Sequence, residues 1–126
     1  NSTQFSSTDC GYESPNCAVS RSYDGMYDLS PDDYMVTTRK YAITENSKLR
    51  FYAAAENHLY AAEHYGVAIS TTTNVSPSAF TTIWEETMIA KGNEVPRGER
   101  APGQWYSKTV DLSAYAGQEV YIALRW

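Results

Sequence analysis

Hydrophobic and polar residues alternate along much of the chain in short runs, the pattern expected of strands that bury one face. The clearest run covers residues 48–55. Its apolar positions share one face and its polar positions the other, namely Leu49, Phe51, Ala53 and Ala55 against Lys48, Arg50 and Tyr52. Residues 64–72 and 119–126 repeat the alternation. The pattern therefore predicts β-strands at these three places.

Further apolar or β-branched runs predict strands at 17–23, 33–38, 81–87 and 105–112. Turn residues separate the runs, and no long helical pattern alternates with them, which argues against a parallel α/β sheet. About seven short strands with this spacing are typical of an antiparallel sandwich. We therefore predict an all-β fold, an antiparallel jelly-roll β-sandwich over residues 17–126, preceded by a polar coil over residues 1–16.

Three short segments also admit a helical interpretation. Residues 53–57 and 61–64 are rich in alanine but too short to form independent helices. Residues 76–80 form a candidate capped turn, because Pro77 suits the first helical position.

The last predicted strand stops at Trp126 in the middle of its pattern, without a closing turn or a polar tail. A strand that ends this way is expected to leave an exposed, adhesive edge. We therefore expect a fold that lacks terminal strands, which would be disordered, cut away or supplied by a partner.

The charge of the chain argues against two kinds of partner. Its 126 residues carry a net charge of −5, and the lysines and arginines form no stripe. Nucleic acids and anionic membranes select basic surfaces, so we expect neither as a partner. The chain also lacks the apolar run of about 20 residues that a membrane-spanning helix needs.

The aromatic content favours a recognition surface. The chain has 11 tyrosines and 3 tryptophans, and such side chains offer flat apolar area with a polar tip at little entropic cost. The alternative is that tyrosine simply suits half-buried strands.

Cys10 and Cys17 lie in a segment rich in Gly, Pro, Ser and Asn. Two cysteines without nearby histidines do not make a zinc site, which usually has four ligands. We predict that they form a disulfide, which would place the protein outside the cytoplasm.

The sequence gives little indication of a catalytic site. The two histidines, His58 and His64, lack a third metal ligand at close spacing. Glu85 and Glu86 are adjacent, so a strand would point them to opposite faces, where they cannot form a paired acid and base. No G-x-S-x-G or P-loop motif occurs. We therefore predict that the chain is not an enzyme.

A basic connection in this acidic chain is the candidate contact region. Residues 90–103 include Lys91, Arg97 and Arg100, and Trp84 and Trp105 flank them. Tryptophan stacks on sugars or fills protein hot spots, and arginine pairs with carboxylates. The predicted ligand-binding residues are Trp84, Trp105, Arg97, Arg100 and Tyr60. The alternative is a solvated, protease-sensitive loop.

Five stretches, in order from residue 17 to 126, resemble conserved strands of the cleaved-adhesin family. They are SPDDYMVT (30–37), EHYGVAIS (63–70), FTTIWEET (80–87), RGERAPGQWYSKTVDL (97–112) and EVYIALR (119–125). This family includes adhesin domains of gingipain proteases and of hemagglutinins, and it grades into choice-of-anchor modules of secreted bacterial proteins.

The resemblance implies a jelly-roll sandwich on the cell surface or in secreted form, and adhesion to host proteins, glycans or cells. It also implies a structural calcium ion. The acidic end regions of the family are absent here, so its metal ligands cannot be assigned. Oxygens near the corresponding place come from Asp24, Asp28, Asp32 and Asp33, for which the alternative is turn formation.

These observations leave three functional hypotheses. The first is an extracellular, cell-surface adhesin module that recognises a host protein or glycan. The second is a structural subunit of a surface assembly, completed by a strand from a neighbouring domain or subunit. The third is a non-catalytic accessory domain of a secreted protease or other hydrolase.

Overall fold

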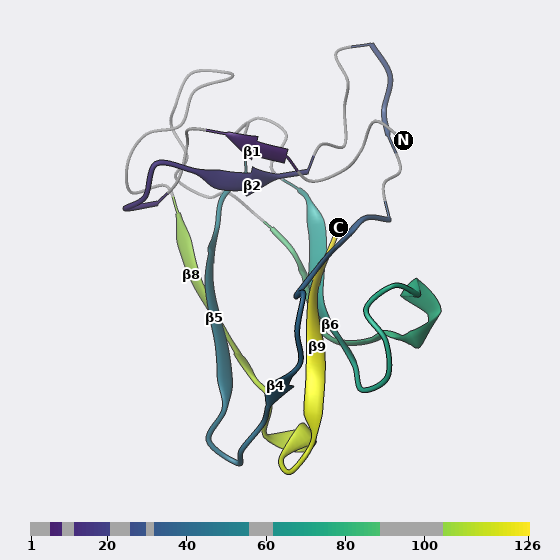
Figure 1. The fold of residues 1–126 in the computed structure, drawn as a ribbon. Helices are drawn as coiled ribbons and strands as arrows, with labels where there is room; N and C mark the ends of the chain where they lie inside the picture. Colours follow the sequence, from purple (N-terminus) through teal and green to yellow (C-terminus); the bar gives the residue numbers. More distant parts are fainter. Residues whose placement is uncertain (1–5, 9–11, 21–25, 30–31, 56–61, 89–104) are drawn as a thin grey trace.

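The computed structural model describes residues 6–8, 12–20, 26–29, 32–55, 62–88 and 105–126, which form antiparallel sheets in two layers (Figure 1). The larger sheet has the order β3 (Tyr34–Val36), β9 (Glu119–Arg125), β6 (His64–Ser70) and β7 (Thr81–Thr87), and β4 (Tyr41–Ala42) also pairs with β9. The second layer pairs β5 (Lys48–Ala53) with β8 (Tyr106–Asp111). A separate pair joins β1 (Ser6–Thr8) to β2 (Cys17–Val19). The prediction of an all-β antiparallel sandwich is confirmed.

The core lies between the two layers and uses the faces that the alternation predicted. Its main cluster consists of Ile43, Val67, Ile69, Val110, Leu112 and Val120. Leu49 and Phe51 of β5 and Ile122 and Leu124 of β9 pack against that cluster. Hydrophobic burial between sheets is the main contribution to the stability of such a fold.

β9 is a central strand of the larger sheet. It pairs with β6 along one side and with β3 and β4 along the other. Val120 and Ala123 are fully buried within it. The expectation that the last strand presents an exposed edge is therefore wrong, because β3 and β4 pair with the side of β9 that β6 leaves open.

Most strand limits agree closely with the alternation, and the shortest elements depart from it. β7 matches its predicted limits, and β6 ends two residues before Thr72. β4 was not predicted, because two exposed residues carry no period. β1 corrects the prediction of an uninterrupted polar coil over residues 1–16, because the polar segment Ser6–Thr8 pairs with β2.

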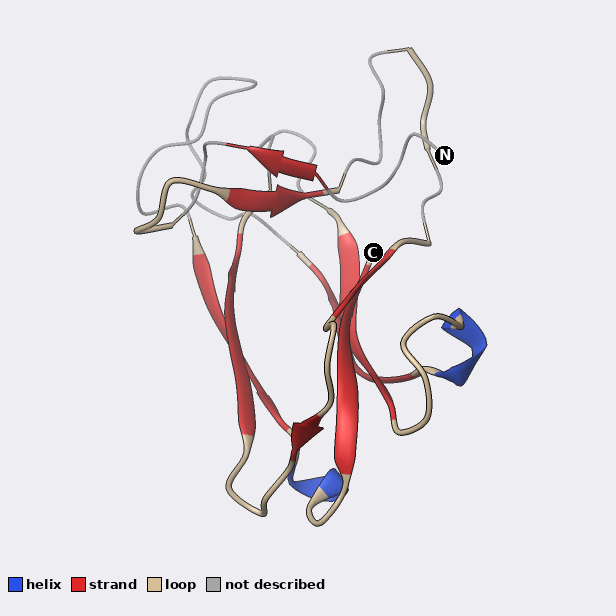
Figure 2. Cartoon of the chain, in the orientation of Figure 1, coloured by secondary structure: helices blue, strands red, loops and turns tan. Residues whose placement is uncertain are grey.

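The predicted short turn after β6 is confirmed as a 3-10 turn, η2 (Pro77–Ala79), with Pro77 at its start. A second 3-10 turn, η3 (Ser113–Tyr115), precedes β9, and Figure 2 shows both in blue. Of the two alanine-rich segments, Ala53 belongs to β5, while residues 56–61 lie outside the described residues. Within the described ranges, no helix is long and apolar enough to cross a membrane.

The connection between β6 and β7 packs over the outer face of the larger sheet. The Oγ atom of Ser70 accepts hydrogen bonds from the backbone of Thr72 and Thr73 at 3.3 and 3.1 Å, which fixes the start of the connection. The ring of Phe80, at its end, lies 5.8 Å from that of Tyr34 on β3. The connection forms one wall of the pocket described next.

Candidate functional site

A pocket of about 430 Å³ opens between β3 and the β6–β7 connection. It is lined by Asp32, Asp33, Tyr34, Met35, Val36, Asn74, Val75, Pro77 and Phe80, and we call it the acid–aromatic pocket. Antiparallel pairing with β9 holds β3, and the backbone of Asp33 exchanges two hydrogen bonds with that of Trp126. The amide of Asn74 donates a hydrogen bond to the carbonyl of Thr37 at 3.5 Å. The walls are thus tied to the sheet.

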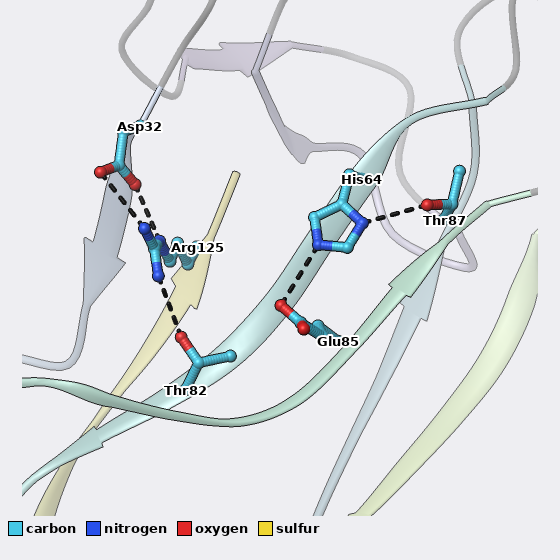
Figure 3. A network of polar contacts seen from close by, with 6 residues as sticks. All are labelled: Asp32, His64, Thr82, Glu85, Thr87 and Arg125. Atoms are coloured by element: carbon cyan, nitrogen blue, oxygen red, sulfur yellow. Dashed lines mark hydrogen bonds and ion pairs between the residues drawn. The ribbon is translucent and has the colours of Figure 1, made fainter.

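Arg125 of β9 contacts two residues that line this pocket, and Figure 3 shows its hydrogen bonds to one of them, Asp32. Its Nε and Nη2 atoms donate to the two carboxylate oxygens of Asp32 at 2.8 and 3.3 Å, and its guanidinium lies over the ring of Tyr34, 5.4 Å from the ring centre. The hydrogen bond with Asp32 raises the pKa of Arg125, although burial opposes that shift. The pair joins β9 to the residues that precede β3.

Small residues on β6 allow Arg125 to cross that strand. Its Nη1 atom donates to the hydroxyl of Thr82 on β7 at 3.1 Å, and between them lie Gly66 and Ala68 on the outer face. A Cβ atom added at Gly66 would lie 2.6 Å from the backbone oxygen of Trp84. Glycine is therefore required here by the close approach of two strands.

His64 lies on the same outer face, between two polar residues of β7 (Figure 3). Its Nδ1 atom lies 3.0 Å from the hydroxyl of Thr87, and its Nε2 atom lies 3.2 Å from the carboxylate of Glu85. The side chains of His64 and Glu85 are about 60% exposed, so water screens their interaction. The arrangement orients an imidazole on the surface.

Glu85 and Glu86 point to opposite faces of β7, as the sequence predicted. Glu86 accepts a hydrogen bond from the Tyr65 hydroxyl and pairs with Lys108 of the other sheet at 2.6 Å. Burial raises the pKa of Glu86, but the hydrogen bonds from Lys108 and Tyr65 outweigh it, and the net pKa is lowered. Burial and the Glu86 hydrogen bond raise the pKa of Tyr65, so its hydroxyl stays protonated. These groups tie the layers together.

An aromatic cluster covers the outer face of the β5–β8 sheet. The ring of Tyr12 stacks on that of Tyr52 with centres 4.2 Å apart, and it lies 6.5 Å from the ring of Trp105. The guanidinium of Arg50 donates a hydrogen bond to the Tyr52 hydroxyl at 2.9 Å. Tyr52 is 36% exposed. We call Tyr12, Tyr52 and Trp105 the aromatic cluster.

The structure separates the residues that the sequence grouped into one contact region. Trp84 packs between the sheets, with its ring 6.1 Å from Phe51 and 5.6 Å from Tyr65. This corrects its expected place beside a contact loop, because the register with Val67 turns it toward the core. Trp105 lies at the outer surface. Arg97, Arg100 and Tyr60, together with Lys91, lie outside the described residues.

Cys17 is disulfide-bonded. The other cysteine of the chain, Cys10, which is its predicted partner, lies outside the described residues. Cys17 is the first residue of β2, so the disulfide bond is attached to the β1–β2 pair at that residue.

Of the four aspartates offered as calcium ligands by the sequence, the structure describes Asp28, Asp32 and Asp33. Asp32 is paired with Arg125, Asp28 is exposed, and Asp24 lies outside the described residues. No group of three or more His, Cys, Asp and Glu side chains in the described residues is arranged to hold a metal ion. Calcium needs six to eight oxygen ligands, and the structural calcium ion stays a prediction.

Sequence reasoning missed most of the residues that build these two surfaces. Arg125 and Tyr34 meet because their strands pair in register, and residues 91 positions apart carry no local sign of that pairing. Tyr12 fell in a segment treated as coil. A usable signal existed for Tyr52, which occupies a polar position of an alternating strand, where an aromatic residue is expected to be exposed.

The fold and these surfaces define a class of protein, a β-sandwich module that presents aromatic and charged side chains on the outer faces of its two sheets. The sequence profile of the Cleaved Adhesin Domain matches residues 1–126, and the chain belongs to this family. The resemblance inferred from the five stretches is thereby confirmed.

Relatives and solved structures agree with this assignment. The chain is 41% identical over 104 residues to Hemagglutinin A and 38% identical over 108 residues to Lys-gingipain W83, both of Porphyromonas gingivalis. These matches cover 78% and 82% of the chain but only 5% and 6% of the relatives. The chain therefore spans a small part of their length.

Two crystal structures share the fold. The K1 cleaved adhesin domain of Lys-gingipain from Porphyromonas gingivalis W83 superposes with a TM-score of 0.78 at 34% identity. The K3 domain of the same protein gives a TM-score of 0.76 at 34% identity. Each match covers 99% of this chain and 74% of the other.

Proposed function

We propose that the chain is a non-catalytic adhesin module that binds a host protein or glycan at the cell surface or in secreted form. The observation that carries this proposal is the aromatic cluster on the outer face of the β5–β8 sheet. Three aromatic rings gather there beside the exposed Arg50. Such a surface suits stacking on a sugar ring or packing against a protein hot spot.

The parent protein supplies the context of this proposal. The matched relatives include a hemagglutinin and gingipains, and the chain spans only a few per cent of each. We infer that the domain is one of several in a large extracellular protein. In a protease, it would act as an accessory module that brings the catalytic domain to its target.

Erythrocyte binding tests the proposal, because one relative bears the name hemagglutinin. Fluorescent beads coated with the purified chain are incubated with erythrocytes that are untreated, trypsin-treated or periodate-oxidised, with albumin-coated beads as control. Saturable binding that trypsin abolishes identifies a protein receptor, and binding that periodate abolishes identifies a glycan. Binding no greater than that of albumin-coated beads contradicts the proposal.

A structural role is the second candidate, favoured by the open form of the smaller sheet. In the described residues, β5 and β8 pair only with each other. Unpaired strand edges accept strands from neighbours. A chain that acts as a subunit completed in this way should form larger species as its concentration rises, as measured by light scattering. A constant monomer mass would remove this candidate.

A further inference from the structure

The acid–aromatic pocket has a definite chemical character. Its lining includes the acidic residues Asp32 and Asp33 and the apolar side chains of Tyr34, Phe80 and Pro77. No lysine or arginine is among its lining residues, which all lie in the described part of the chain. Val75, at the rim, is 84% exposed. Carboxylates beside aromatic faces are complementary to organic cations.

The chain itself demonstrates this complementarity at two residues that line the pocket. The Arg125 guanidinium makes two hydrogen bonds to Asp32 and lies over the Tyr34 ring. Two of the partners of Arg125, Asp32 and Tyr34, line the pocket. One guanidinium is therefore already held by the two kinds of contact that an external cation would use.

We propose that the acid–aromatic pocket binds an arginine or lysine side chain of a protein partner. The alkyl stem packs against Phe80, Pro77 and Val75, and the cationic head competes with Arg125 for the carboxylate of Asp32 and the ring of Tyr34. This site is separate from the aromatic cluster, because the two lie on the outer faces of different sheets. The module can therefore hold two partners, or two regions of one partner.

Charge supports the same class of partner. The chain carries a net charge of −5, which attracts basic segments over distances longer than the pocket itself. A single side chain in an open pocket binds weakly, so the site contributes selectivity within a larger interface rather than the whole affinity.

The effect of substituting Arg125 on ligand affinity distinguishes a cation site from a purely structural ion pair. Asp32→Asn and Arg125→Gln both break the same ion pair, so a purely structural pair predicts that the two substitutions act in the same direction. A cation site predicts opposite effects. Asp32→Asn removes an acceptor and leaves Arg125 to repel the ligand, whereas Arg125→Gln removes a competitor for Asp32 and Tyr34.

The experiment titrates the isotope-labelled full chain with N-acetylarginine amide, and it follows backbone amide shifts by NMR. N-acetyllysine amide tests the second cation, and N-acetylcitrulline amide is the neutral control of the same shape. We expect both cations to shift the amides of Tyr34, Val36 and Phe80, and citrulline to leave them unchanged. Asp32→Asn should weaken arginine binding about tenfold, and Arg125→Gln should strengthen it several-fold.

Three results would overturn the proposal. They are equal shifts with citrulline and arginine, shifts confined to residues outside the pocket, and a change of the same sign in the two variants. The spectrum of each variant reports its folding directly. If Asp32→Asn proves unfolded, Arg125→Gln still tests the sign.

Discussion

The Lys108 ammonium on β8 lies 2.6 Å from the Glu86 carboxylate on β7, and this contact joins the two sheets of the sandwich. The side chains are 23% and 30% exposed, so the ion pair is only partly screened by water. The Tyr65 hydroxyl of β6 donates a second contact to Glu86, from within the larger sheet. Loss of the carboxylate charge would therefore weaken the attachment between sheets.

Replacement of Glu86 should lower stability in a pH-dependent way. We expect Glu86→Gln to reduce the free energy of unfolding by about 1–2 kcal/mol at pH 7, as measured by urea titration. The pKa of Glu86 is lowered in the folded state from 4.5. Its stabilisation is thus fully present above pH 4.5 and is lost as pH falls through the folded pKa. The difference between wild type and variant should shrink in that acid range.

Glu85→Gln is the matched control for this experiment. Glu85 is the neighbouring residue of the same strand, and its contact with His64 is exposed. We expect a change of no more than about 0.5 kcal/mol. An equal effect of the two substitutions would contradict the role assigned to Glu86.

The two tryptophans that flank the basic connection should behave differently. Trp84 packs against both core clusters, so Trp84→Ala should destabilise the protein by about 3–5 kcal/mol. Trp105 lies in the outer aromatic cluster, so Trp105→Ala should cost no more than about half as much. Urea midpoints of the two variants, compared with wild type, check this order. A larger loss for Trp105→Ala would place that residue in the core.

Replacement of Gly66 by alanine should lower the stability of the protein. The added Cβ of Gly66→Ala would meet the Trp84 backbone oxygen, and a shift of β7 against β6 should cost about 1–3 kcal/mol. Gly117→Asn is the control, because its φ of +82° is tolerated by asparagine and no atom lies within 4 Å of the new Cβ. Thermal unfolding of both variants measures the difference. A stable Gly66→Ala protein would refute the close approach.

The disulfide of Cys17 should support the aromatic cluster. If Cys10 is the partner, the bond closes a short loop that contains Tyr12 and adds about 2 kcal/mol in the chain-entropy account. We expect no reactive thiol in the unreduced, denatured chain, as measured by alkylation and mass spectrometry. Reduction should then make the ring of Tyr12 more accessible to iodination. Alkylation of Cys17 without reduction would contradict this prediction.

The strands were predictable because their side chains report burial directly. Alternation located β5 and β6 and assigned Leu49, Phe51 and Val67 to the core, and a β-branched and aromatic run located β7. The position of β9 was not predictable, since an apolar alternating strand has the same local pattern at an edge and at the centre of a sheet. Pairing partners depend on the whole topology rather than on the strand itself.

The candidate surfaces were less predictable for the same reason. Asp32 and Arg125 are far apart in the sequence and meet only after β3 pairs with β9. Trp84 was expected at a contact surface because it flanks the basic connection. Tryptophan is frequent in both cores and interfaces, so the residue type alone does not decide between them. The face of the sheet to which the Trp84 side chain points depends on a bulge between Val67 and Ala68. This bulge shifts the register of β7, and the sequence does not reveal it.

The most direct test of the account compares bead binding to erythrocytes for wild type, the Tyr52→Ala/Trp105→Ala variant and Thr109→Ala. Thr109 lies exposed on the same outer sheet face and serves as the matched control. The account predicts that the double variant loses at least about tenfold in binding and that Thr109→Ala retains it. Undiminished binding by a folded double variant would contradict the assignment of the aromatic cluster as the adhesive surface.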